Sequence, residues 1–387
     1  MMADLVSTNF GRAQMNFTLA CDIMMDLEGS IRPAMYLAKT LVDSGHDVMM
    51  ISPIMSNEVR QHLSSLGIEP LDLKVKLFGK SFGLSLLWFE TWGREAFLRL
   101  NSRRVNRDHL VTINFSHTLV VPSMFWYLQG PTSTALRDME NELSGVYKSV
   151  YRVLKPAIEY SDGKLIRDIR KESAFTVANS KFCASLYRKW GIEADDVIYP
   201  PIDCKLFQPR TSDPSADYVL TYFGKETKFS TVREIADRGV KIKAFGSKVP
   251  FIPREMIVHP NIDFMGRISS EQLVDSYSNA LFTLFTFTHE PFGYIPVESM
   301  ACGTPTLTYD IQGPSESVVD GQTGWLVKND DEIVRKAVSL WEKGYEQNIR
   351  LNCVKEASRY DRGLYVKKWL DLLKKANLSW SHSNQLT

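Results

Sequence analysis

Two glutamates, Glu290 and Glu298, lie eight positions apart within residues 288–305, which read THEPFGYIPVESMACGTP. A carboxylate accepts hydrogen bonds, so two of them in one groove suit the paired hydroxyls of a sugar. With Glu290 just before a helix and Glu298 about a turn into it, the rise of ~1.5 Å per residue places both along such a groove. The alternative is that both are surface carboxylates beside an ordinary strand-helix turn.

The residues around the glutamates predict a strand, a turn and a helix. The apolar run 281–288 predicts the strand, Gly293 gives the turn its backbone freedom, and Gly303 marks the end of the helix. Backbone amides near Phe292 and Gly293 would then lie at a helix N-terminus. Such a terminus favours a phosphate or a partly negative sugar oxygen.

The same segment resembles the E-x7-E signature of retaining GT-B glycosyltransferases, in particular glycosyltransferase family 4. The E-P-F-G start and the E-S-M-A-C-G-T-P finish are both in place. The resemblance implies an α/β GT-B fold, in which two Rossmann-like domains face each other across a cleft. It also implies that Glu290 contacts the transferred hexose and Glu298 the nucleotide ribose. Phe292, Gly293 and Tyr294 would belong to the donor site.

Further donor-site candidates follow predicted strands, where open α/β sheets bind ligands. Gly266 and Arg267 follow the strand 262–265, and the resemblance places them beside the nucleotide base. Gly29 follows the first strand and resembles the glycine turn that leaves room for a diphosphate or an acceptor. The alternative for Arg267 is a solvated side chain without a ligand. The alternative for Gly29 is an ordinary turn glycine with a structural role.

The expected diphosphate clamp departs from the family pattern. Many members carry Gly-Arg and then Lys-Gly after the first strand of the second domain. This chain has Gly224, Lys225 and Lys228 there, with a lysine in place of the arginine. A lysine neutralises phosphate as a point charge without the bidentate fork. We expect Lys225 or Lys228 to hold the diphosphate and leave open which one does.

The acceptor side is predicted from two loops of the first domain. Ser116 and His117 follow one strand, and Gln129 follows the next. Many relatives place a histidine at the position of Gln129, where it helps to position the reacting sugar. This chain has Gln129 there and His117 one loop earlier, so His117 is a catalytic candidate. The alternative is a structural role, which is more common for a single histidine at a strand end.

Composition agrees with a two-domain enzyme that acts on small molecules. A chain of 387 residues with 44% hydrophobic residues can bury two cores. The formal net charge of +1 and the absence of a nucleic-acid-binding motif argue against a nucleic-acid partner. Five scattered cysteines without a C-x-x-C pair indicate a reducing compartment and no zinc site. No signal peptide or membrane-spanning run is recognised, so we expect a cytoplasmic protein.

Strands alternate with helices in both halves, which predicts two parallel-sheet domains. The first unit, a strand, Gly29 and the helix 31–44, is Rossmann-like but lacks G-x-G-x-x-G, which disfavours a dinucleotide oxidoreductase. Ser30 is the predicted N-cap of that helix. In the second half, Ser269 and Gln272 three residues later predict a capping box for the helix 271–280. The predicted parts are a leader at 1–14, an acceptor domain at 15–207, a linker at 208–217, a donor domain at 218–360 and a helix returning to the first domain within 361–387.

Residues 71–110 mix basic side chains with aromatic ones. This pattern suits an anionic membrane surface, and it would imply a lipid-linked acceptor. The alternative is a solvated helix face whose aromatic side chains belong to the core.

The sequence therefore predicts transfer of a hexose, of mannose or glucose type, from a GDP- or UDP-sugar to a hydroxyl acceptor with retention. No metal is expected, because no Asp-x-Asp or His/Asp cluster lies near the site. The rivals are a glycosidase that uses both glutamates and a sugar-nucleotide-binding protein without catalysis.

Overall fold

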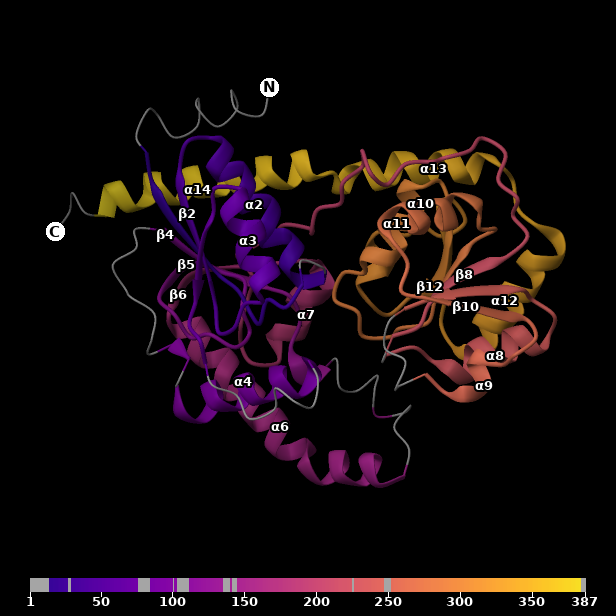
Figure 1. The fold of residues 1–387 in the computed structure, drawn as a ribbon, viewed down its shortest axis with the longest axis horizontal. Helices are drawn as coiled ribbons and strands as arrows, with labels where there is room; N and C mark the ends of the chain where they lie inside the picture. The colour runs from indigo at the N-terminus through magenta and orange to yellow at the C-terminus, as the bar shows by residue number, and fades with distance from the viewer. Residues whose placement is uncertain are drawn as a thin grey trace.

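The computed structural model describes residues 14–26, 29–75, 84–99, 101–102, 111–134, 140, 145–224, 226–246 and 252–383. Lys225 and much of the basic and aromatic segment 71–110 therefore lie outside the described residues. Two parallel sheets, each flanked by helices, lie side by side (Figure 1). The predicted α/β class is confirmed.

The first sheet has seven strands in the order β3-β2-β1-β4-β5-β6-β7, and all its pairs are parallel. Its central strands are apolar along their length, as expected for strands covered on both faces. The strand order reverses between β1 and β4, and ligands of open α/β sheets bind at the carboxyl ends beside such a point. The elements are β1 Asn16–Ala20, η1 Gly29–Ile31, α2 Arg32–Asp43, β2 Asp47–Ser52, α3 Asn57–Ser65, β3 Glu69–Asp72, α4 Leu84–Leu98, β4 Val111–Asn114, β5 Ser123–Leu128, α6 Gly145–Lys171, β6 Ser173–Ala178, α7 Lys181–Arg188 and β7 Asp196–Val197.

The second sheet has six strands in the order β10-β9-β8-β11-β12-β13, again parallel throughout. Its order reverses between β8 and β11, the strands that precede Gly224 and Glu290. The elements are β8 Val219–Tyr222, α8 Phe229–Asp237, β9 Ile242–Phe245, α9 Arg254–Ile257, β10 Ile262–Gly266, α10 Ser270–Asn279, β11 Thr283–Phe285, α11 Tyr294–Ala301, β12 Thr306–Tyr309, η5 Gly313–Glu316, β13 Gly324–Val327, α12 Asp330–Lys343 and α13 Asn348–Ala357.

The chain ends with η6 Ser358–Tyr360 and the long helix α14 Arg362–Ser383. Figure 1 shows α14 leaving the second domain and running beside α2 of the first. Trp369 of α14 is fully buried, and its ring contacts those of Phe115, Phe125 and Tyr127 in the first domain. The described part of this helix therefore completes the core of the first domain.

Helix starts follow the sequence in one case and differ in another. The predicted capping box of Ser269 and Gln272 at the start of α10 is confirmed. The prediction of Ser30 as N-cap of α2 is wrong: the N-cap is Ile31, and no side chain caps the helix. Gly29 adopts a φ of 66° and begins the turn η1, so a backbone turn starts the helix instead.

Trp369→Ala should lower the free energy of unfolding by about 3–5 kcal/mol, because it empties a large buried site between α14 and the first sheet. Urea denaturation followed by circular dichroism measures the change. The matched control is Lys374→Ala on the exposed face of the same helix, which should change stability by less than about 0.5 kcal/mol. Equal stability of the two variants would contradict a role for α14 in that core.

Candidate active site between the two domains

The segment that carries both glutamates forms the predicted turn and helix. Gly293 is the N-cap of α11 with a φ of 88°, which confirms the predicted backbone freedom. A Cβ at Gly293 would also lie 2.6 Å from Pro314 Cγ. Among the described residues, no side chain caps α11. Its first amides are therefore not satisfied by a capping side chain, as an anion site at a helix start requires.

The loop before α11 is held by its own domain. The backbone amide of Glu290 donates to Gln312 Oε1 at 3.2 Å, and the amide of Gly313 donates to the Glu290 carbonyl at 2.9 Å. Gln312 is buried, and its Nε2 donates to Thr308 Oγ1 at 3.0 Å. These bonds fix the backbone of Glu290 at the carboxyl end of the second sheet, where its side chain is half-buried.

The same loop also meets the first domain. Ser180 Oγ donates to the Pro291 carbonyl, and a Cβ at Gly130 would overlap the Pro291 ring. Glu316 in η5 accepts bonds from the amides of Lys181 and Phe182, at 3.0 and 2.6 Å, where α7 begins. A carboxylate at a helix N-terminus interacts favourably with the positive end of the helix dipole. The predicted donor loop therefore lies at the contact between the domains.

Glu298 is buried, with 3% of its surface exposed, and it pairs across the domain contact with Arg32 Nη1. Tyr277 Oη lies 3.4 Å from the other carboxylate oxygen of Glu298. Arg32 begins α2 and also lies over the Tyr294 ring, at 5.0 Å from its centroid. Burial lowers the pKa of the Arg32 guanidinium, but the Glu298 carboxylate and Tyr294 outweigh burial and raise it. Arg32 is a site residue that the sequence prediction missed.

The two candidate lysines differ in what the structure shows. Lys225 lies outside the described residues, while Gly224 donates its amide to Thr227 Oγ1 at 2.8 Å. Lys228 Nζ lies 2.8 Å from Asp330 Oδ1 and 4.6 Å from the centroid of the Tyr309 ring. Burial raises the pKa of Asp330, but hydrogen bonds from Lys228 and Tyr309 outweigh it and lower that pKa. Lys228 is therefore already paired with a carboxylate.

Other predicted donor residues occupy different surroundings. Gly266 ends β10 with a φ of 67°, and Arg267 beside it is exposed, as is Gly29 after β1. Phe292 is buried among the rings of Tyr199, Tyr294 and Tyr360, so its side chain belongs to the core. At Phe292 only the backbone is left to meet a ligand.

The acceptor-side candidates gather around a carboxylate that sequence reasoning missed, Asp22. Ser116 Oγ and His117 Nδ1 both contact it, the latter at 3.2 Å. Gln129 instead donates through Nε2 to the Phe115 carbonyl at 2.8 Å, which holds its side chain on the backbone. One signal could have identified Asp22: it follows β1 at the same sheet edge where Ser116 and His117 follow β4.

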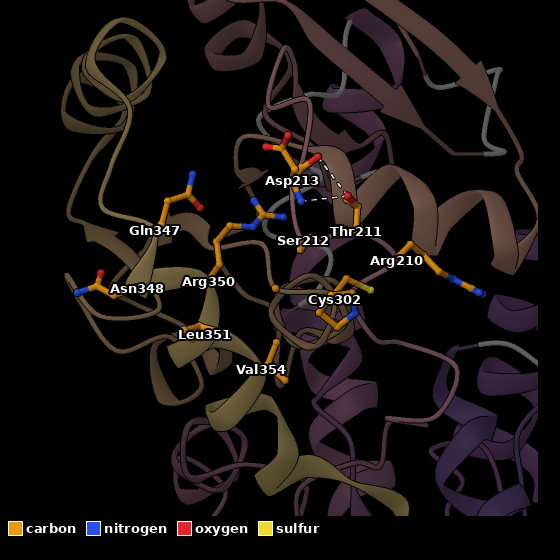
Figure 2. Close-up of a pocket in the computed structure, with 12 residues that line it drawn as sticks. Arg210, Thr211, Ser212, Asp213, Cys302, Gln347, Asn348, Arg350, Leu351 and Val354 are labelled. Carbon is orange, nitrogen blue, oxygen red and sulfur yellow. Dashed lines mark hydrogen bonds between the residues drawn. The ribbon is translucent and has the colours of Figure 1, made fainter.

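A surface pocket of about 900 Å³ lies elsewhere on the second domain, between the linker segment 209–213, the end of α11 and α13 (Figure 2). Arg350 lines it but donates to the Ala280 and Ser278 carbonyls at 3.1 and 2.6 Å. None of the described lining residues is a predicted donor or acceptor residue. The candidate site is therefore the contact between the domains.

In the described part of the chain, no group of three or more His, Cys, Asp or Glu side chains is arranged to hold a metal ion. No described helix combines the length and apolar character needed to cross a membrane.

Part of the second domain matches a known protein family. Residues 254–359, which include both glutamates, match the model of the family glycosyl transferases group 1. A D-inositol 3-phosphate glycosyltransferase of Mycolicibacterium smegmatis is 25% identical over 159 residues, 35% of this chain and 37% of that protein. An alpha-1,3/1,6-mannosyltransferase of Neurospora crassa is 44% identical over 48 residues, 12% of this chain and 10% of that protein. The matched segments thus span well under two thirds of these relatives.

Solved structures match over most of the chain. The crystal structure of Anabaena Alr3699/HepE with UDP-glucose gives a TM-score of 0.64 at 15% identity, covering 94% of this chain and all of that one. Sucrose-phosphate synthase from Thermosynechococcus elongatus gives a TM-score of 0.67 at 13% identity over 95% of this chain and 100% of that chain. At such identities the likeness concerns the fold.

Arg32→Met should lower the free energy of unfolding by about 3 kcal/mol, because it leaves the buried Glu298 carboxylate without its cation. Lys39→Met is the matched control on α2, since Lys39 pairs with Asp43 on the exposed face; it should cost less than about 0.5 kcal/mol. Urea denaturation measures both variants. If Glu298→Gln does not reduce the cost of Arg32→Met in a double-mutant cycle, the two residues are not coupled.

Both domains, the strand orders and the matched structures lead to one conclusion: this chain has the GT-B fold, and residues 254–359 of its second domain match the family model of glycosyl transferases group 1.

Proposed function

We propose that this chain is a retaining glycosyltransferase of the family 4 type. It moves a hexose, of mannose or glucose type, from a nucleotide diphosphate sugar to a hydroxyl acceptor. One observation carries the proposal: the loop of Glu290 and the start of α11 follow the switch-point strand β11 and also touch the first domain. A donor at the second sheet would there face an acceptor at the first.

The proposed roles follow from position. Glu290 contacts the hexose, and Glu298 the ribose once Arg32 shares or leaves its carboxylate. The first amides of α11, with Lys225, stabilise the departing diphosphate, where negative charge grows as the glycosidic bond breaks. Gly266 and Arg267 flank the base. The acceptor attacks from the same face as the leaving group, with no metal required.

The ion pair of Glu298 argues against the glycosidase alternative. A glycosidase needs two carboxylates directed at one glycosidic bond, whereas Glu298 is 3% exposed and its carboxylate pairs with Arg32 of the other domain. The second alternative, a sugar-nucleotide-binding protein without catalysis, gains support from the pairing of Lys228 with Asp330. Turnover separates it from an enzyme.

The first experiment is incubation with a panel of UDP- and GDP-sugars, with free nucleotide as the readout. The Anabaena structures contain UDP and UDP-glucose, so UDP-sugars belong in that panel. Release of nucleotide supports transfer. Binding of a donor with no release, for every acceptor tried, would favour the non-catalytic alternative.

Glu290→Gln should reduce turnover at least about a hundredfold, because it removes a charge aimed at the sugar while the backbone bonds of the loop remain. It is a cleaner test than Glu298→Gln, which also breaks the pair with Arg32. Glu271→Gln, exposed at the start of α10, is the control of equal chemistry and should turn over normally. Turnover by Glu290→Gln at the wild-type rate would contradict the proposed role of Glu290 at the hexose.

For the acceptor we propose a lipid-linked glycan, reached by a cytoplasmic protein that binds the inner membrane face through residues 71–110. In the described part of this segment, Phe97 and Leu98 are 62% and 56% exposed, while Trp92 is buried. Arg94 and Arg99 pair with Glu90 and Asp168. Support for the membrane surface therefore rests on the exposed end of α4.

Replacing Arg103, Arg104 and Arg107 together should weaken binding to anionic vesicles by about 1 kcal/mol per charge. Vesicle co-sedimentation measures it, and wild-type binding should fall as salt rises. Neutral vesicles provide the control. If the wild type ignores anionic vesicles at low salt, these side chains form only a solvated surface.

A further inference from the structure

Asp22 and His117 meet at the switch point of the first sheet. Asp22 follows β1, and His117 follows β4, the strand that pairs with β1 where the order of the sheet reverses. Loops at such a point form the ligand crevice of open α/β sheets. Because the two residues are 95 positions apart in the chain, this contact cannot be predicted from neighbouring residues.

The two oxygens of Asp22 have different partners. Oδ1 holds the loop: it accepts bonds from Ser116 Oγ, from the Thr118 amide at 2.9 Å and from Thr118 Oγ1 at 2.6 Å. Oδ2 faces the ring of His117, with Nδ1 at 3.2 Å. The His117 amide lies 3.1 Å from each oxygen. Oδ1 therefore fixes the loop, and Oδ2 is the oxygen that fixes the imidazole.

This arrangement selects one tautomer of His117. An ionised carboxylate only accepts hydrogen bonds, so Nδ1 must carry a proton, and in the neutral ring Nε2 then presents its lone pair. Burial raises the pKa of Asp22, but its hydrogen bonds with His117, Ser116 and Thr118 outweigh burial, so the pKa is lowered. His117 Nε2 is buried and has no hydrogen-bond partner among the described residues.

We propose that Asp22 is a positioning residue that holds His117 with Nε2 as an acceptor, and that Nε2 receives a hydrogen bond from a sugar hydroxyl. The inference deepens the proposed function and rests on it for the sugar. A neutral nitrogen lone pair does not attract a phosphate oxygen, which has no proton to donate. His117 therefore accepts a hydrogen bond from a hydroxyl of the transferred or accepting sugar, and other groups bind the diphosphate.

Asp22→Asn is the most direct test, because the side-chain amide of the asparagine can adopt only one orientation in this loop. The Oδ1 position receives three donors besides the His117 amide, so the amide oxygen of Asn must stay there. The amide nitrogen then falls at the Oδ2 position and donates to Nδ1. The ring must take the opposite tautomer, with the proton on Nε2.

The first measurement is the tautomer itself, by 15N NMR of histidine-labelled protein at pH 9, with His117→Ala to identify the signal. We expect the Nδ1-protonated form in the wild type and the Nε2-protonated form in Asp22→Asn. Thr118→Val is the matched control: it removes one bond to Oδ1 and should keep the wild-type tautomer. An Nε2-protonated or doubly protonated wild-type ring would overturn the proposal, whether or not a donor is known.

The second measurement uses turnover with a series of deoxyfluoro sugars. Fluorine replaces a hydroxyl but has no proton to donate to Nε2. At one ring position the wild type should prefer hydroxyl over fluorine about tenfold more strongly than Asp22→Asn does, while Thr118→Val behaves as the wild type. Comparing the variants cancels the intrinsic effect of fluorine on the reaction. Equal preferences at every position would overturn the role of Nε2, whereas no turnover of any donor would contradict the proposed function alone.

Discussion

The constraint on which the rest of the site depends is the burial of the Glu298 carboxylate. A buried charge is costly unless a partner neutralises it, and here the partner comes from the other domain. Arg32 begins α2, just after the turn that follows the first strand, and Glu298 lies in α11, just after the loop that follows β11. Their pairing therefore brings the switch points of the two sheets face to face.

Several predicted site residues already have structural partners. Lys228 binds Asp330, the side chain of Gln129 binds a backbone carbonyl, and Phe292 is packed among tyrosine rings. At the start of α11, the N-cap residue Gly293 offers only its backbone. Positively polarised amides can stabilise a diphosphate without a dedicated arginine. This is consistent with the departure of the chain from the family pattern after Gly224.

Sequence patterns were most reliable where one strand or helix decides the outcome. The strand predicted at 262–265 is found at Ile262–Gly266, and the capping box of α10 is in place, since both depend on neighbouring residues. The strand predicted from the apolar run 281–288 shortens to Thr283–Phe285, because only those residues belong to the ladders with β8 and β12. The prediction of Ser30 as N-cap was wrong because the turn η1, which begins at Gly29, leads the backbone into α2 at Ile31.

The sequence by itself determined the alternation of strands and helices, the turn at Gly293 and the spacing of the two glutamates, because these follow from residues close together in the chain. The tertiary structure alone decided the partners: Arg32 with Glu298 across 266 residues, and Asp22 with His117 across 95. Such pairs form only when parallel strands bring distant loops to one sheet edge and the domains meet. The residues next to Arg32 or Asp22 in the chain do not reveal such a partner, and for Asp22 the only signal was its place after the first strand, so both residues were missed.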